Sequence, residues 1–181
     1  MAAEKASAAY GCEGLPGDTM TGPVTIDIIK ERMKEFGLTE QVHANRVLVK
    51  TVPGKVHDAI GTLQTMLGCN RLITISTLDN GETFELLYHV IGPHRIIITL
   101  EIDLPRSQPT TPTVSDILPP AGIYERQIHD LFGIIFEGNP NLKKIILNED
   151  WPEHEYPLRK DWKPGPDTFY GGIKVERSEG N

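Results

Sequence analysis

The tripeptide Asp79-Asn80-Gly81 constrains the fold of this 181-residue chain most strongly, because it separates two alternating apolar runs. Asn-Gly favours the tight turns that join antiparallel strands. Residues 72–78 and 83–91 are therefore predicted to form a β-hairpin. A third strand follows the turn at Gly92-Pro93, with its apolar side chains on one face: Ile96, Ile98, Leu100 and Ile102.

Two helices are expected before this hairpin. The first follows Pro23 and ends by Gly37, with one apolar stripe made of Ile26, Ile29, Met33 and Phe36. The second is opened by Pro53 and closed by Gly68, and its predicted buried face consists of Val56, Ile60, Leu63 and Leu67. Residues 46–52 read as a strand between them. This order predicts an α+β fold, in which helices cover one face of a mainly antiparallel sheet.

Prolines organise the second half of the chain. Residues 104–120 contain five prolines, which exclude a helix and favour an extended path. A helix is expected at 121–132, a short strand at 134–136 and a further strand at 144–147. The predicted division is a flexible N-terminal lead (1–22), an α+β domain (23–150) and a long extended C-terminal tail (151–181). Aromatic residues in that proline-rich tail predict that it binds a partner and becomes ordered there.

Composition excludes several functions. The formal net charge of −7 argues against nucleic-acid binding, which needs a basic surface. No apolar run is long enough to span a bilayer, and the N-terminus does not resemble a secretory signal. The chain is therefore expected in the cytosol or on the cytosolic side of a membrane, without direct membrane insertion.

No residue pattern indicates a cofactor of its own. The two cysteines, Cys12 and Cys69, cannot supply the roughly four ligands of an iron–sulfur cluster. Six histidines lack ligand spacing, and His89 and His94, which flank a turn, lack a third ligand. Phosphate-binding glycine motifs are also missing. We expect no metal, flavin or nucleotide in this chain.

Two charged clusters, residues 124–134 and 155–162, instead have the character of surfaces that meet another protein. In the first, Glu125 and His129 are one helical turn apart, as are Arg126 and Asp130. Each pair reads either as solvated surface or as a polar latch to a neighbour. The predicted partner interface is Tyr124, Glu125, Arg126, His129, Asp130, Tyr156, Pro157, Leu158, Arg159, Lys160 and Trp162.

These clusters carry a family resemblance. The run Tyr-Glu-Arg-x-x-x-Asp-Leu-Phe-Gly-Ile at 124–134, then Gly-x-Pro-x-Leu-Lys-Lys at 138–144 and Tyr-Pro-Leu-Arg-Lys-Asp at 156–161, resembles the 30 kDa (C) subunit of respiratory complex I. Equivalent subunits of archaeal F420H2 dehydrogenases and energy-converting membrane-bound hydrogenases belong to the same family. The similarity covers about residues 115–162.

The resemblance implies a cofactor-free scaffold subunit in the peripheral arm of an ion-translocating oxidoreductase. Its implied partners are a large, hydrogenase-like (49 kDa-type) subunit and a small cluster-bearing subunit, with the iron–sulfur clusters in those partners. Electrons would pass from NADH, F420H2 or ferredoxin to a quinone or methanophenazine. Gln127 and Asn139 depart from the respiratory pattern. The tail at 151–157 is one or two residues longer than the usual respiratory version and looks more like archaeal and hydrogenase-type members.

Other interpretations stay open beside this one. The chain is alternatively the equivalent subunit of a proton-reducing hydrogenase, or a free-standing protein-interaction module. A small enzyme using Glu125 and His129 is disfavoured, since neither a nucleophile nor an oxyanion hole accompanies them.

Overall fold

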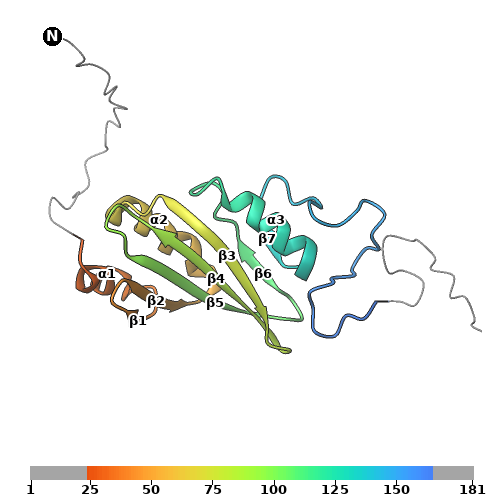
Figure 1. Ribbon diagram of the computed structural model, residues 1–181, viewed down its shortest axis with the longest axis horizontal. Coiled ribbons are helices and arrows are strands. Elements are labelled where there is room, and N and C mark those ends of the chain that lie inside the picture. Colours follow the sequence, from red (N-terminus) through yellow and green to blue (C-terminus); the bar gives the residue numbers. More distant parts are fainter. Residues whose placement is uncertain (1–23, 165–181) are drawn as a thin grey trace, which may run out of the picture.

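A computed structural model describes residues 24–164, and its main element is a five-stranded sheet (Figure 1). The strand order is β1-β2-β5-β4-β3; only β2 and β5 run parallel among these neighbours, and the other pairs are antiparallel. The predicted α+β class and mainly antiparallel sheet are confirmed. The strands are β1 Leu38–His43, β2 Arg46–Thr51, β3 Arg71–Asp79, β4 Thr83–Ile91 and β5 Ile97–Pro105. The predicted N-terminal lead and the residues after 164 lie outside the described part.

The predicted hairpin is confirmed as β3 and β4. Gly81 adopts a φ of 93°, which a glycine accommodates without strain. Its N–H donates to Asp79 Oδ1 at 2.8 Å, so an aspartate side chain closes the turn. β4 then pairs with β5 along its whole length, which places Phe84 beside Leu104 and Val90 beside Ile98 on the buried face.

Helices α1 (Ile26–Met33) and α2 (Val56–Leu67) contribute their apolar stripes to the core under this sheet. All four predicted α2 residues are buried, and Gly68 ends the helix in the left-handed conformation with a φ of 66°. α1 is shorter than the spacing suggested, because it ends at Met33, and Phe36 packs against the core from the following turn. A short 3-10 turn at Pro53–Lys55, η1, leads into α2.

A second unit, made of α3 (Ala121–Phe132) and two short parallel strands, lies beside the sheet (Figure 1). These strands are β6 (Thr110–Pro112) and β7 (Ile135–Glu137). α3 has the predicted bounds, and β7 lies within a residue of its predicted position. One hydrophobic core joins the two units, and Phe132 of α3 meets Phe84 of β4 edge to face with ring centroids 6.0 Å apart.

Two strands were missed at the level of sequence, and one predicted strand does not form. The missed strands are β1 and β6, and β6 was missed because it lies in the proline-rich segment. Pro112 is tolerated there since it ends a three-residue strand. Residues 144–147 do not form a strand, because the backbone N–H groups of residues 145–147 donate to the Asp130 side chain of α3 instead.

Candidate partner interface

The charged helix α3 is fixed to its own domain at both ends. Near its start, the Tyr124 hydroxyl donates to the Ile73 carbonyl of β3 at 3.0 Å. Near its end, His129 Nδ1 lies 2.8 Å from the Ile134 carbonyl, so this nitrogen carries the proton and donates. Both side chains therefore position the helix, although each was predicted to face a partner.

Glu125 is fully buried rather than exposed. One carboxylate oxygen accepts from the Val114 N–H at 2.9 Å. The other accepts from the Thr113 hydroxyl at 2.5 Å and from the Asn139 amide at 2.7 Å. Three donors from two separate segments satisfy this buried charge, as burial requires. Glu125 thus joins α3 to the segments on either side of it.

Asp130 and Arg126 act in the same way on residues 143–147. Asp130 is 4% exposed, and its Oδ2 accepts three successive backbone N–H groups at 2.8–3.0 Å: those of Ile145, Ile146 and Leu147. Arg126 donates from Nε and Nη2 to the carbonyls of Lys143 and Lys144 at 3.1 and 3.0 Å. Burial raises the pKa of Asp130, but the three N–H donors and Lys144 outweigh it, so the pKa lies below its ordinary value.

These contacts correct the sequence interpretation of α3. The pairs Glu125/His129 and Arg126/Asp130 are neither solvated ion pairs nor charges left free for a neighbour, since each side chain bonds to other parts of the chain. The exposed positions on α3 include Ile123, at 61%, and Gln127. The face of α3 that is open to a partner is therefore less charged than the sequence suggested.

The second cluster is held against the end of α3. Gly133 closes the helix with a φ of 74°, and the Tyr156 ring lies directly over it. Arg159 Nε donates to the Phe132 carbonyl at 2.7 Å, and its guanidinium stacks on Tyr156, 4.3 Å from the ring centroid. The Leu158 N–H donates to the Leu131 carbonyl at 3.2 Å. The motif residues thus cap the free carbonyls of α3.

A buried aspartate in the hairpin turn anchors the rest of this segment. Asp79 is 7% exposed and accepts from Arg106 and from the Lys160 N–H, at 2.6 and 2.8 Å. The same guanidinium contacts Asp161. Burial alone would raise the pKa of Asp79. The hydrogen bonds from Arg106, Lys160 and Gly81 outweigh this effect and lower the pKa to about 2. We call this group, Asp79, Arg106, Lys160 and Asp161, the turn latch.

Residues 151–162 make several contacts with their own domain and with each other. Trp151 and Trp162 stack on each other with ring centroids 5.8 Å apart. Leu158 is nevertheless 52% exposed, and Lys160 is also exposed. Among the predicted interface residues of the tail, these two side chains are the most open to a neighbour. The predicted tail residues after 164 lie outside the described part.

Sequence reasoning missed several residues that build this site. Asp79 was interpreted only as a turn former. Its pairing with Arg106, 27 positions further along the chain, could not be inferred from local sequence. Thr113 lay in a segment interpreted only as extended. Asn139 was recognised as a departure from the respiratory pattern, and the structure shows that it donates to Glu125.

The described part of the chain contains no group of three or more His, Cys, Asp or Glu residues that could hold a metal ion. None of the helices in residues 24–164 is long and apolar enough to cross a bilayer. Burial raises the pKa of the Cys69 thiol to about 12, which makes it a poor nucleophile.

Comparison with known proteins identifies the family. The fold is an α+β domain whose C-terminal segment bonds to the end of α3 and to the hairpin turn. The profile described as "Respiratory-chain NADH dehydrogenase, 30 Kd subunit" matches residues 49–168. The chain belongs to this family, as its motifs indicated.

Curated relatives carry the name of the C subunit of NADH-quinone oxidoreductase. The protein from Herpetosiphon aurantiacus is 39% identical over 93 residues, which cover 51% of this chain and 53% of that protein. The protein from Novosphingobium aromaticivorans is 32% identical over 160 residues, covering 85% of this chain and 49% of that protein. The chain thus spans about half the length of the curated relatives it matches.

Two solved structures share the fold. One is a chain in the structure of the membrane-bound sulfane sulfur reductase (MBS), described as an archaeal respiratory membrane complex. It has 26% identity and a TM-score of 0.66, and the match covers 76% of this chain and 84% of that one. The other is the trypsin-resistant fragment of Nqo5, with 26% identity and a TM-score of 0.54, covering 64% of this chain and 97% of the fragment.

Proposed function

We propose that this protein is a cofactor-free scaffold subunit in the peripheral arm of a complex I-like, ion-translocating membrane oxidoreductase. It clamps a large hydrogenase-like (49 kDa-type) subunit against a small cluster-bearing subunit. The iron–sulfur clusters belong to those partners, and electrons pass through them from NADH, F420H2 or ferredoxin to a quinone or methanophenazine. This assignment places the chain peripherally, on the cytoplasmic side of the membrane.

The observation that carries the proposal is how the family motifs are used. Three buried carboxylates, those of Glu125, Asp130 and Asp79, hold separate segments of the chain against α3 or against the hairpin turn. Such anchoring makes a rigid surface. A rigid surface suits a subunit that fixes the positions of electron carriers without holding one. It also accounts for the charged motifs, whose side chains bond within the chain.

Within this proposal the contact surface differs from the set of charged motif residues. The exposed side chains beside the anchors are better placed for a partner than the anchors themselves. They are Ile123, Gln127, Leu158 and Lys160. Burying Leu158 against a partner would remove an apolar side chain from water without disturbing the fold of this chain.

A second assignment is the equivalent subunit of an archaeal-type complex that does not use NADH, including a proton-reducing hydrogenase. The match to the archaeal respiratory complex has the higher TM-score and covers more of this chain than the match to Nqo5. The length of the tail at 151–157 favours the same assignment.

Purification of the tagged full-length chain from native membranes tests the proposal. We expect a large hydrogenase-like subunit and a cluster-bearing subunit to co-purify, with clusters visible in the absorption and EPR spectra of the assembly. Supplying NADH, F420H2 or reduced ferredoxin to that assembly identifies the donor. A chain that emerges alone would overturn the scaffold assignment and favour a free-standing interaction module.

A further inference from the structure

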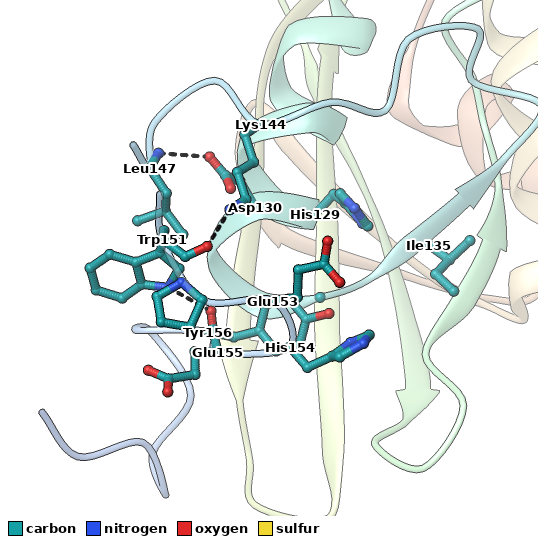
Figure 2. A pocket seen from close by; sticks show the side chains of 12 residues that line it. His129, Asp130, Ile135, Lys144, Leu147, Trp151, Glu153, His154, Glu155 and Tyr156 are labelled. Atoms are coloured by element: carbon teal, nitrogen blue, oxygen red, sulfur yellow. Dashed lines mark hydrogen bonds between the residues drawn. The ribbon is translucent and has the colours of Figure 1, made fainter. Parts of the chain in front are cut away.

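A cavity of about 360 Å³ lies between α3, β7 and the segment formed by residues 151–156 (Figure 2). His129 and Asp130 line it from α3, and Ile135 lines it from β7. Lys144 and Leu147 contribute from the segment that Asp130 holds. A cavity of this size is within the range of ligand-binding pockets.

Much of the cavity wall is apolar. Figure 2 shows Leu147 and Trp151 on one side of the hollow and Ile135 on the other. Pro152 and Tyr156 also belong to the wall. An apolar lining takes an apolar group, because burying it there releases water from both surfaces.

The wall is held in place by specific bonds. Lys144 Nζ donates to the Trp151 carbonyl at 2.6 Å, and Trp151 Nε1 donates to the Glu155 carbonyl at 2.9 Å (Figure 2). The Leu147 backbone N–H donates to Asp130 Oδ2 at 2.8 Å, which fixes Leu147 in the wall. A pocket whose walls are already ordered loses little conformational entropy when a partner enters.

The rim of this cavity is acidic. Glu153 and Glu155 line it, and Glu149 and Asp150 precede Trp151 in the same exposed segment. Lys144 also lines the cavity, but its ammonium is bonded to the Trp151 carbonyl and lies close enough to Asp130 to lower the pKa of that carboxyl. The exposed charges at the rim are therefore mainly negative and complement a basic partner.

We propose that this cavity binds a bulky apolar side chain that projects from a basic segment of a partner subunit. The proposal rests on the function given above and specifies the chemistry of one contact within it. The apolar wall takes the side chain, while Glu153 and Glu155 pair with flanking Lys or Arg residues. Carboxylates at the rim disfavour an anionic small molecule.

The test uses the tagged full-length chain in its native host. The variant Glu153→Gln with Glu155→Gln removes two rim charges and keeps an acceptor for the Trp162 indole, which lies 3.3 Å from Glu155. Its control, Glu31→Gln with Glu35→Gln, removes two exposed charges from α1 and the turn after it. We expect about tenfold less partner retained by the rim variant and full retention by the control.

Ile135→Asp tests the apolar wall separately. Ile135 is 47% exposed, so the fold should tolerate the change, and the melting temperature of the free chain verifies this. Its control is Leu38→Asp, at a residue on β1 that is 66% exposed. Partner retention should fall about tenfold for the first variant only.

Carbodiimide coupling in the assembled complex identifies the occupant. We expect Glu153 or Glu155 to be joined to a lysine of another subunit, next to a bulky apolar residue. Coupling to Lys174 of this same chain would overturn the proposal and make its own C-terminal segment the occupant. Equal retention by rim variant, wall variant and controls would also overturn it, while leaving the scaffold function intact. A wild-type chain that retains no partner would instead defeat the scaffold function.

Discussion

One guanidinium nitrogen of Arg106 donates to both carboxylate oxygens of Asp79 at 2.6 Å. This pair joins the turn of the β3–β4 hairpin to the residue that follows β5. The C-terminal segment bonds to both residues, through Lys160 to Asp79 and through Asp161 to Arg106. Asp79, in the turn that most strongly predicted the hairpin, is thus also the residue that anchors the C-terminal segment. Mutations in the hairpin turn should therefore act on the tail.

Asp79→Asn should remove part of the acid sensitivity of the protein. The pKa of Asp79 is about 2, below its ordinary value of 3.8. A carboxyl whose pKa is lowered by folding stabilises the fold above its unfolded pKa, and this contribution is lost as pH falls through the folded pKa. Wild type should lose about 1–2 kcal/mol through this group between about pH 4 and pH 2.

Urea unfolding across that pH range measures the effect. The Asn variant should be less stable than wild type at neutral pH, with the difference shrinking as pH falls. Asp103→Asn, at an exposed carboxyl on β5, is the control and should follow wild type. If Asp79→Asn shows the wild-type pH dependence, the turn latch is not the source of it.

Glu125→Ala should destabilise the domain strongly, although the sequence presents this residue as part of a surface helix. The change removes the acceptor of three hydrogen bonds, from Thr113, Val114 and Asn139. Leaving buried donors without partners should cost about 3 kcal/mol of unfolding free energy. Gln127→Ala, two residues on and exposed, should stay within about 0.5 kcal/mol. Equal unfolding midpoints for the two variants would contradict the buried position of Glu125.

Asp130→Ala should release residues 145–147 from α3. Three backbone N–H groups lose their acceptor at once, so their hydrogen exchange should accelerate by about tenfold or more. The β4–β5 amides should keep their protection, because the main sheet does not contact this carboxylate. Unchanged exchange at Ile145, Ile146 and Leu147 would show that Asp130 does not hold this segment in solution. If exchange accelerates as expected, a loss of partner binding in this variant follows from local unfolding of residues 145–147.

Periodicity and turn chemistry were enough to predict most of the domain. The α2 face, the hairpin at Asn80-Gly81 and the bounds of α3 all depend on local rules, namely apolar spacing and glycine at chain reversals. The fold class followed from the order of these elements. β1 was not predicted because its side chains are largely exposed, so its sequence lacks the alternation of apolar and polar residues that burial imposes.

The roles of the charged residues could not be predicted, because their partners are distant in sequence. Lys160 donates to Asp79 across 81 positions, and Arg159 donates to Phe132 across 27. Helical spacing correctly brought Arg126 and Asp130 to one side of α3, yet it could not reveal that the segment after Leu142 lies against that side. Family resemblance marked these residues as important, and the structure shows that they anchor the chain to itself.

Gly133→Ala should detach the segment around Tyr156. An added Cβ would lie 2.3 Å from Tyr156 Cζ and 2.7 Å from an Arg159 nitrogen, and Gly133 has a φ of 74°. The left-handed backbone alone should cost alanine about 1 kcal/mol, and displacing the ring adds to this. We expect a total loss of about 2 kcal/mol or more. Trp fluorescence reports the detachment, since both tryptophans of the chain, Trp151 and Trp162, lie in this segment.

A matched change elsewhere separates this clash from a general effect of glycine replacement. Gly61 lies inside α2, and a Cβ there would meet Ile117 Cδ1 at an ordinary 3.7 Å. Gly61→Ala should therefore stabilise the protein by about 0.5–1 kcal/mol and leave the tryptophan spectrum unchanged. Should Gly133→Ala also keep the wild-type spectrum and unfolding midpoint, the Tyr156 ring does not rest on the end of α3. The cavity wall formed by residues 151–156 would then lose its fixed position, and the docking site proposed for a basic partner segment would lose its structural basis.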